Sequence, residues 1–374
     1  MNGSPTAGTA KPLIFVLDAS IDITGALIAA RRQAGLLRGE ARFMLVLPAA
    51  SRVPDAALPE FERVIRLPMV DLRRSWRAVL LYGPALLVAG YRLARALRRH
   101  DCRRLQGNDF HLMQAAAARL FGYRGTILTW VRFDPARYGP IGRVWLRVGR
   151  SVSARMVAVS RFIIGRLPPG IDAELLYDPP PQWPLVPASP ANPQRIIFVG
   201  NYIEGKGQDV AIRAFARIAP RFETAVLAFH GGDMGLDKNR AYRVGLEALA
   251  AESGLGERIM FNDFAADTRS LLSDGGVALN CSQSESFSFT CLEASMAGLP
   301  VIATRSGGPE EIIDHGHTGF LVDIADWETI AERLAWLFDH PLEAAAMGRS
   351  GQSLVAERFS VAHFQEQIRA LLDI

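Results

Sequence analysis

The chain has 374 residues, of which 49% are hydrophobic and 21% are charged, as in an ordinary globular protein. Its length exceeds the usual size of one hydrophobic core, so we expect two domains. The net charge of +4 is unevenly distributed: residues 1–185 hold 27 Lys and Arg against 13 Asp and Glu, and residues 186–374 hold 15 against 25. No run of eighteen uninterrupted apolar residues occurs, so nothing in the sequence need span a bilayer.

The start of the chain and its cysteines favour a reducing, cytoplasmic setting. The opening MNGSPTAGTAKPLIFVLD has one lysine and a short apolar run, which predicts a first strand more readily than a signal sequence. The three cysteines, Cys102, Cys281 and Cys291, have no metal-ligand spacing. Their odd number argues against a disulfide framework.

Strand-like and helix-like segments alternate along the chain, which is typical of parallel sheets wrapped by helices. Before residue 178 we expect strands over 12–18, 41–48 and 125–131 and helices over 22–37 and 110–122. After residue 193 we expect strands over 195–201, 224–231, 258–263, 275–281 and 300–304, with helices between them.

A proline-rich segment divides the two series. Residues 178–193 read DPPPQWPLVPASPANP, with seven prolines and no basic residue. Proline cannot donate to a strand ladder and restricts its neighbours, so this segment is a stiff connection. We therefore predict an N-terminal domain over 1–178, a linker over 179–193, and a C-terminal domain over 194–374 whose last helix can pack back on the first domain.

The most informative segment is ESFSFTCLEASMAGLPVIATRSGGPEEIIDHGHTGFLV, residues 285–322. Seven residues separate Glu285 from Glu293, and two glycines, Gly307 and Gly308, follow. This pattern resembles the retaining glycosyltransferases of family 4, specifically over residues 194–374 and diffusely before them. The resemblance implies the α/β fold called GT-B, with two Rossmann-like domains facing across a cleft. It also implies that the C-terminal domain binds a nucleotide sugar and the N-terminal domain the acceptor.

The residues around the two glutamates are suited to a diphosphate. Small and hydroxyl side chains precede a helical run that starts near Cys291, so free backbone N–H groups converge at a helix N-terminus. Glu293 can accept hydrogen bonds from a ribose diol, and Glu285 from hydroxyls of the transferred sugar, the roles that the resemblance also assigns. A plain helix start would explain Glu293 but not Glu285. The other predicted donor contacts here are Ser286, Phe287, Ser288, Phe289 and Thr290, with Phe264 near the base.

A second segment, residues 195–218, resembles the first strand and phosphate loop of the same domain, with Lys206 and Gly207 as the matching pair. Lys206 would stabilise charge on the departing diphosphate, although a solvated loop lysine is the alternative. Family members usually carry an arginine where this chain has Asn201. Because asparagine offers only neutral donors, another cation must assist or the step is slower.

In the N-terminal half the matches are single residues. Gly25 follows the first strand and is the predicted contact to the diphosphate and sugar, with a plain turn as the alternative. Many family members have a histidine where this chain has Arg132, which we take as a catalytic candidate, with His111 as a substitute and a packed or solvated side chain as the alternative for both. The chain has no Asp-x-Asp pair, which argues against the metal-dependent GT-A type, so no metal or other cofactor is expected.

Arginines flank an apolar run at residues 78–94 and recur between residues 143 and 155. Such a run suits a chain lying on an anionic membrane surface beside a lipid-linked acceptor, whereas a buried helix with solvated ends is the alternative. The sequence shows no nucleic-acid-binding motif, so no nucleic-acid partner is expected. The predicted membrane and acceptor residues are Arg73, Arg74, Arg77, Arg98 and Arg99.

Together these features predict a metal-independent, retaining hexosyltransferase. It would move a hexose from a GDP- or UDP-sugar to a lipid-linked saccharide, peripherally bound at the inner membrane face, in surface polysaccharide or lipopolysaccharide assembly. The resemblance implies that the acceptor hydroxyl attacks on the face that the diphosphate leaves. Two alternatives stay open: a GT-B enzyme with a soluble acceptor, of synthase or sugar-nucleotide epimerase type, and a degenerate subunit that binds without catalysis.

Overall fold

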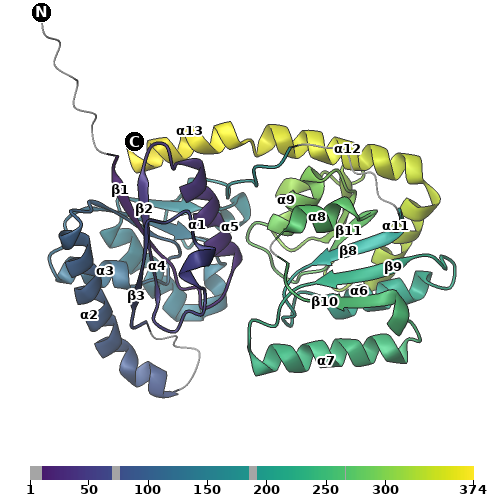
Figure 1. The fold of residues 1–374 in the computed structure, drawn as a ribbon, viewed down its shortest axis with the longest axis horizontal. Helices are drawn as coiled ribbons and strands as arrows, with labels where there is room; N and C mark the ends of the chain where they lie inside the picture. Colours follow the sequence, from purple (N-terminus) through teal and green to yellow (C-terminus); the bar gives the residue numbers. More distant parts are fainter. Residues whose placement is uncertain (1–10, 70–75, 185–191, 266) are drawn as a thin grey trace, which may run out of the picture. The chain divides into compact units, whose positions relative to one another are not determined.

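A computed structural model describes residues 11–69, 76–184, 192–265 and 267–374. The chain divides into two compact units, which are coloured in sequence order in Figure 1. The first unit comprises Met1–Pro179 and Ala362–Ile374, and the second comprises Pro180–Val361. Each unit is built around one parallel sheet.

The first unit contains a seven-stranded sheet in the order β3-β2-β1-β4-β5-β6-β7, with every pair parallel. Strands β1 and β2 are apolar along nearly their whole length, as expected for strands covered on both faces. The strands are β1 Leu13–Leu17, β2 Arg42–Pro48, β3 Arg63–Leu67, β4 Arg104–Gly107, β5 Thr126–Val131, β6 Arg155–Ala158 and β7 Glu174–Leu175.

Helices cover both faces of this sheet. The connections from β1 to β2 and from β3 to β4 run in opposite directions across the sheet, so right-handed crossovers put α1 and α2 on opposite faces. The C-terminal helix α13 bonds to α1 and the turn after it, through Gln365 to the Leu36 carbonyl at 3.0 Å and Arg369 to Glu40 at 2.6 Å. The helices are α1 Gly25–Leu36, α2 Trp76–Arg99, α3 Gln114–Leu120, α4 Gly139–Val152, α5 Arg161–Gly165 and α13 Val361–Leu372.

The second unit contains a six-stranded parallel sheet in the order β10-β9-β8-β11-β12-β13. Its strands are β8 Arg195–Val199, β9 Val226–His230, β10 Ile259–Asn262, β11 Val277–Asn280, β12 Val301–Thr304 and β13 Gly319–Val322. Its helices are α6 Gln208–Ile218, α7 Asp237–Glu252, α8 Thr268–Ser273, α9 Phe289–Met296, α10 Pro309–Ile312, α11 Trp327–Asp339 and α12 Pro341–Arg358.

Both sheets therefore have the Rossmann-like order, in which the chain starts at the centre and reverses direction between its first and fourth strands. The predicted fold class is confirmed. The reversal lies between β1 and β4 in the first unit and between β8 and β11 in the second. Ligands of such open sheets bind at the carboxyl ends of the strands at this point.

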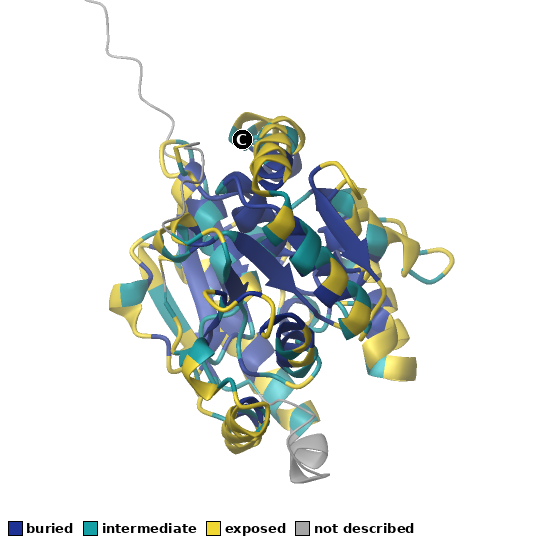
Figure 2. Cartoon of the chain, turned by 90° about the vertical axis from the view of Figure 1, so that its right-hand side faces the viewer, coloured by how far each residue is buried: buried dark blue, intermediate teal, exposed yellow. Residues whose placement is uncertain are grey.

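The strands form the buried centre of each unit, and the outer faces of the helices are exposed (Figure 2). All three cysteines are buried and free. Burial raises the pKa of the Cys291 thiol to about 12, so this side chain stays neutral and serves packing. Within the part of the chain that the structure describes, no helix combines the length and apolarity needed to cross a bilayer.

Candidate functional site

Two loops meet at the reversal point of the second unit. The loop after β8, residues 200–207, receives a hydrogen bond from the Gln283 amide to the Gly205 carbonyl at 2.9 Å. Gly207 has a φ of 80°, and a Cβ at this position would lie 2.2 Å from the Cys281 carbonyl oxygen. Only glycine fits such a left-handed, close approach, so this residue type allows the two loops to touch.

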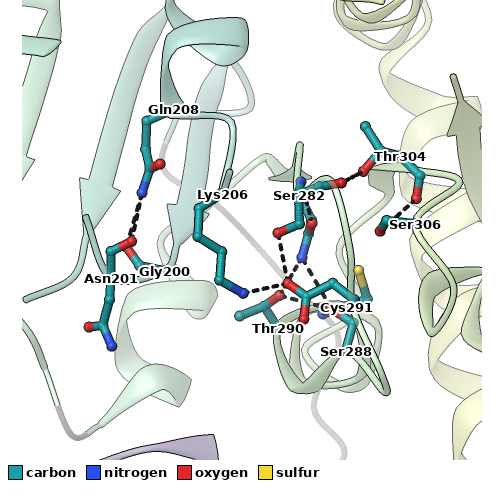
Figure 3. Close-up of polar contacts among 12 residues, drawn as sticks. Gly200, Asn201, Lys206, Gln208, Ser282, Ser288, Thr290, Cys291, Thr304 and Ser306 are labelled. Atoms are coloured by element: carbon teal, nitrogen blue, oxygen red, sulfur yellow. Dashed lines mark hydrogen bonds and ion pairs between the residues drawn. The ribbon is translucent and has the colours of Figure 1, made fainter. Parts of the chain in front are cut away.

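The contact between these loops brings Lys206 and Glu285 together. The Lys206 ammonium donates to Glu285 Oε1 at 2.6 Å, and the Ser282 hydroxyl donates to the same oxygen at 2.7 Å. The two side chains are 32% and 16% exposed, so the pair can be reached from solvent. Figure 3 shows Lys206 extending from its loop toward the loop that holds Ser282. The structure thus assembles two of the predicted site residues into one charged pair.

Side chains and backbone hold the Glu285 loop in place. The Thr304 hydroxyl donates to the Ser282 carbonyl at 2.5 Å (Figure 3). The Glu285 amide donates to the Ser306 carbonyl at 2.9 Å, and the Glu285 carbonyl accepts from the Gly308 amide at 2.8 Å. With its backbone bonded on both sides, Glu285 is presented by a rigid support.

Helix α9 begins directly after this loop, two residues earlier than the predicted start. Ser288 is the N-cap: its hydroxyl accepts a hydrogen bond from the Cys291 amide at 3.3 Å. Asn280, the last residue of β11, donates to Ser288 at 3.1 Å and to the Thr290 hydroxyl at 2.8 Å. This role of Asn280 was not predicted, although a polar residue at the end of a buried strand indicates such a contact.

Glu293 lies on α9 and is 5% exposed. Its Oε2 atom accepts a hydrogen bond from the Thr268 hydroxyl, on the first residue of α8, at 2.8 Å. Thr268 was not predicted, because it stands 25 residues away in a segment without a motif. The bond fixes the carboxylate in one orientation, which suits a group that must meet a ligand without rearranging.

The other predicted donor contacts on this loop are packed to different extents. Phe287 is buried, and its ring lies at 6.0 Å from that of Phe289. Phe287 can therefore offer a ligand mainly its backbone groups, whereas Phe289 is partly exposed. Ser286 and Thr290 are partly exposed, and the Ser288 hydroxyl is engaged as the helix cap.

Asn201 and Phe264 lie where the loops after β8, β9 and β10 meet. The Asn201 amide oxygen accepts a hydrogen bond from the Gly232 amide at 3.0 Å, and its carbonyl accepts one from Gln208 at 2.9 Å. Figure 3 shows the latter bond. A Cβ on Gly232 would lie 3.5 Å from the Phe264 Cβ, and Phe264 is 44% exposed. Asn201 thus ties two loops together, beside an aromatic ring that is open to solvent.

In the first unit, Gly25 is the first residue of α1 and follows the cap Thr24, which accepts from the Leu27 amide at 3.2 Å. Arg132 is buried: its guanidinium donates to Asn108 at 3.0 Å and forms an ion pair with Asp178. The pair fastens the start of the proline-rich segment to the end of β5. A catalytic role for Arg132 would require both contacts to open.

Of the predicted membrane arginines, Arg98 and Arg99 are exposed on the last turn of α2, and Arg98 donates to the Phe121 carbonyl at 2.6 Å. Arg73 and Arg74 lie outside the described residues. Arg77 belongs to α2, but its side chain lies outside the described part of the structure.

A lysine–glutamate pair beside a helix N-terminus, at the reversal point of one of two Rossmann-like units, is typical of the GT-B class of nucleotide-sugar enzymes. Residues 182–354 match the family model of "Glycosyl transferases group 1". Over this segment, which lies in the second unit, the chain belongs to this family, whose members are retaining GT-B glycosyltransferases that use nucleotide sugars.

Relatives of stated activity agree with this assignment. The chain is 26% identical over 343 residues, 83% of both chains, to a GDP-mannose-dependent alpha-(1-6)-phosphatidylinositol monomannoside mannosyltransferase of Mycobacterium tuberculosis. The match to the Mycolicibacterium smegmatis enzyme of the same name is 29% identical and spans half of that protein. This chain is also 29% identical to the lipopolysaccharide core biosynthesis glycosyltransferase LpsE of Rhizobium meliloti, over 170 residues that make up 45% of this chain and 47% of that protein.

A solved structure with the same fold is that of Anabaena HepE in complex with UDP and glucose. The two structures superpose with a TM-score of 0.80 and 18% sequence identity, and the comparison covers 96% of this chain and 99% of that chain. This likeness shows the fold over nearly the whole length.

Proposed function

We propose that the protein transfers a hexose from a GDP- or UDP-sugar to a lipid-linked saccharide at the inner face of a membrane, in surface polysaccharide or lipopolysaccharide assembly. The observation that carries the donor half of this proposal is the Lys206–Glu285 pair, which stands beside the capped start of α9 at the reversal point of the second unit. The acceptor half rests on the surface of the first unit.

On the donor side, the amides at the start of α9 would bind the diphosphate, because helix N-termini attract anions. Lys206 would leave Glu285 partly and contact the phosphate oxygen that becomes negative as the sugar departs. Glu285, relieved of its cation, would accept hydrogen bonds from the sugar hydroxyls. Glu293, already held by Thr268, would accept from the ribose diol.

No carboxylate of the predicted site is assigned as a nucleophile under the sugar. The protein supplies orientation and electrostatic stabilisation, and the acceptor hydroxyl attacks on the face that the diphosphate leaves. The leaving phosphate oxygen then takes the hydroxyl proton. This scheme requires Lys206 to be cationic at the moment of departure.

On the acceptor side, helices α2, α3 and α4 contain no Asp or Glu. Apolar side chains are exposed on two of them: Leu87, Val88 and Tyr91 on α2, and Ile141 and Val144 on α4. Exposed arginines follow them on the same helices, including Arg95 on α2 and Arg147 on α4. Guanidinium groups beside exposed apolar side chains suit an anionic lipid surface. Relatives that act on phosphatidylinositol monomannoside and on lipopolysaccharide core support a lipid-linked acceptor.

The test is a transfer assay with GDP-mannose, GDP-glucose, UDP-glucose and UDP-galactose, each with vesicles that carry lipid-linked saccharides or with soluble sugars. The expected result is release of nucleoside diphosphate that depends on the lipid-linked acceptor, with the anomeric configuration of the donor retained. Equal turnover with a soluble sugar would move the acceptor assignment to that class. Absence of release from every donor would indicate a binding subunit.

A further inference from the structure

The loop after β4 in the first unit holds a carboxylate and an imidazole that face each other. Asp109 Oδ2 and His111 Nδ1 are 3.4 Å apart. Both atoms are buried, and neither has a hydrogen-bond partner within the described residues. The Asp109 side chain is 4% exposed and that of His111 is 20% exposed, so the imidazole reaches the surface while the carboxylate does not.

Asp109 is fixed from behind. Its Oδ1 atom accepts hydrogen bonds from the backbone amides of Phe110 at 2.8 Å and Arg132 at 3.2 Å. The other oxygen, Oδ2, faces His111 Nδ1. Because an ionised carboxylate only accepts hydrogen bonds, it favours the imidazole tautomer with its proton on Nδ1. The outer nitrogen, Nε2, then carries a lone pair that can accept a hydrogen bond from a ligand.

Aromatic rings fix the plane of the imidazole. Tyr138 stacks on His111, with ring centroids 5.8 Å apart and an interplanar angle of 24°. Trp145 and Phe110 lie at 6.2 Å and 6.1 Å. Phe133 lies at 6.5 Å and is 38% exposed, so one ring beside the imidazole is open to solvent. The group has the composition of a small-ligand site, in which apolar rings surround one positioned polar atom.

We propose that His111 Nε2 and the Phe133 ring bind the saccharide of the acceptor, with Nε2 accepting a hydrogen bond from one of its hydroxyls and Phe133 packing on its C–H face. This inference rests on the proposed function. A sugar presents both kinds of surface, which matches a positioned nitrogen next to an open ring. Asp109 is a positioning residue, since it acts through His111.

The position of the group favours the acceptor over the donor. Most residues proposed to bind the donor, Lys206 and Glu293 among them, belong to the second unit, and Gly25 is the exception. Two of the rings that hold His111 come from α4 and the turn before it, and α4 carries exposed Ile141 and Val144 on its outer side. A lipid anchored along α4 would have its saccharide at the edge where His111 lies.

The experiment compares wild type with His111→Phe, His111→Gln and Asp109→Asn, and uses His100→Phe as the matched control. His100 is a partly exposed histidine of the same unit that packs on Phe15, with ring centroids 5.9 Å apart. The probes are GDP-mannose and UDP-glucose as donors and octyl α-mannoside and octyl β-glucoside as acceptors. Release of nucleoside diphosphate gives separate KM values for donor and acceptor. Saturation-transfer NMR of the octyl glycosides measures acceptor binding alone, and thermal unfolding checks that each variant is folded.

In His111→Phe the acceptor KM should rise about tenfold or more, as expected for one lost hydrogen bond to a well-positioned group, while the donor KM stays unchanged. His111→Gln should recover part of the loss, because its amide oxygen can accept in place of Nε2. Asp109→Asn should raise the acceptor KM less than His111→Phe, since an amide facing Nδ1 favours the other tautomer. His100→Phe should match wild type.

An acceptor KM within about twofold of wild type in His111→Phe, or an equal rise in the donor KM, would overturn the inference while the proposed function stands. If wild type releases no nucleoside diphosphate, the proposed function fails, and the NMR measurement still decides. Octyl glycoside binding that is present in wild type and lost in His111→Phe supports the site. If His111→Phe binds the octyl glycosides as wild type does, or if wild type does not bind them, the proposed acceptor site is wrong.

Discussion

The ammonium of Lys206 and the carboxylate of Glu285 are 2.6 Å apart, although 79 residues separate them in the chain. Lys206 lies in the loop after β8 and Glu285 in the loop after β11, and the strand order of the second unit reverses between these two strands. Without ligand the two charges stabilise each other. In the proposed mechanism, a bound diphosphate would offer Lys206 a stronger anion and leave Glu285 available to the hydroxyls of the sugar. The pair would then couple phosphate binding to sugar binding.

Replacing Glu293 and replacing Glu285 should change different properties of the enzyme. Glu293→Ala should weaken nucleoside diphosphate binding about ten- to a hundredfold, because ribose hydrogen bonds present in both ground and transition states are lost. Glu285→Ala should lower kcat with the sugar donor and leave the Kd for free diphosphate within about threefold. Calorimetric titration with GDP and UDP, and steady-state kinetics, measure these quantities.

Thr268 provides a check on the Glu293 assignment. Thr268→Val keeps the shape of the side chain but removes the hydroxyl that donates to Glu293 at 2.8 Å. It should weaken diphosphate binding in the same direction as Glu293→Ala and by less. The exposed Glu343 on α12 serves as the control, since Glu343→Ala should leave affinity unchanged. If Glu285→Ala weakens diphosphate binding as much as Glu293→Ala does, the division of roles is wrong.

Ser288 should matter for stability as the cap of α9. Ser288→Ala removes the acceptor for the Cys291 amide and a partner of Asn280, so the free energy of unfolding should fall by about 1–2 kcal/mol. Ser288→Thr should restore most of it, because threonine also caps. Ser286→Ala, two residues earlier and partly exposed, should cost less than about 0.5 kcal/mol. Urea denaturation followed by circular dichroism gives the three values, and equal losses at both serines would contradict the capping role.

Much of the fold could be read from the sequence because its strands are unusually apolar. The runs LIFVL and RFMLVLP of β1 and β2 are buried on both faces and stand between clear helical patterns. Strands β3 and β6 are among those that were not predicted. They begin with arginine, are short, and read RVIRL and RMVA, so their apolar pattern is weak and their burial comes from neighbouring strands.

The site was predicted unevenly for a physical reason. Glu285, Glu293 and Lys206 belong to motifs that are local in the sequence. Thr268, the partner of Glu293, stands 25 residues away in the chain, and such a contact is not encoded in local spacing. The partner of Arg132 is more distant still: Asp178 stands 46 residues later, at the start of the proline-rich segment. The sequence around an isolated arginine after a strand does not indicate whether its side chain is exposed or buried against such a distant partner.

His230 should make the second unit less stable in acid. Burial lowers the pKa of this histidine from its usual 6.5, because the charged form is desolvated at the end of β9. A lowered folded pKa means that the unfolded chain binds more protons below pH 6.5. The stability contributed by neutral His230 is therefore complete above that pH and is lost as the pH falls below it, by at most about 1.4 kcal/mol per pH unit.

This dependence can be measured by urea denaturation at pH 7.5 and 5.5. The loss of unfolding free energy on acidification should be smaller in His230→Asn than in wild type, whatever the substitution does to stability at pH 7.5. His317→Asn, at an exposed histidine of the same unit, should retain the wild-type pH dependence. An unchanged slope in His230→Asn would show that other groups control it.

Transfer should not depend on a divalent metal. In the proposed mechanism the amides at the start of α9 and the Lys206 ammonium balance the diphosphate charge. Activity in excess EDTA should therefore remain within about twofold of the untreated enzyme, whereas Lys206→Ala should lower kcat by about a hundredfold, as for the loss of one group that stabilises the leaving charge. Complete loss in EDTA, restored by magnesium or manganese, would exclude this mechanism.

The first unit should bind anionic membranes through its acid-free helices. Each arginine that reaches the lipid should contribute about 1 kcal/mol, and the attraction should weaken at high salt as the Debye length shortens. Co-sedimentation with vesicles containing phosphatidylglycerol should fall sharply when Arg143, Arg147 and Arg150 of α4 become glutamine, and further when Arg98 and Arg99 of α2 are added. The matched control replaces three exposed arginines of the second unit, Arg213, Arg217 and Arg349, by glutamine and should bind as wild type does. Equal binding of wild type to neutral and anionic vesicles, or binding to neither, would favour a soluble acceptor.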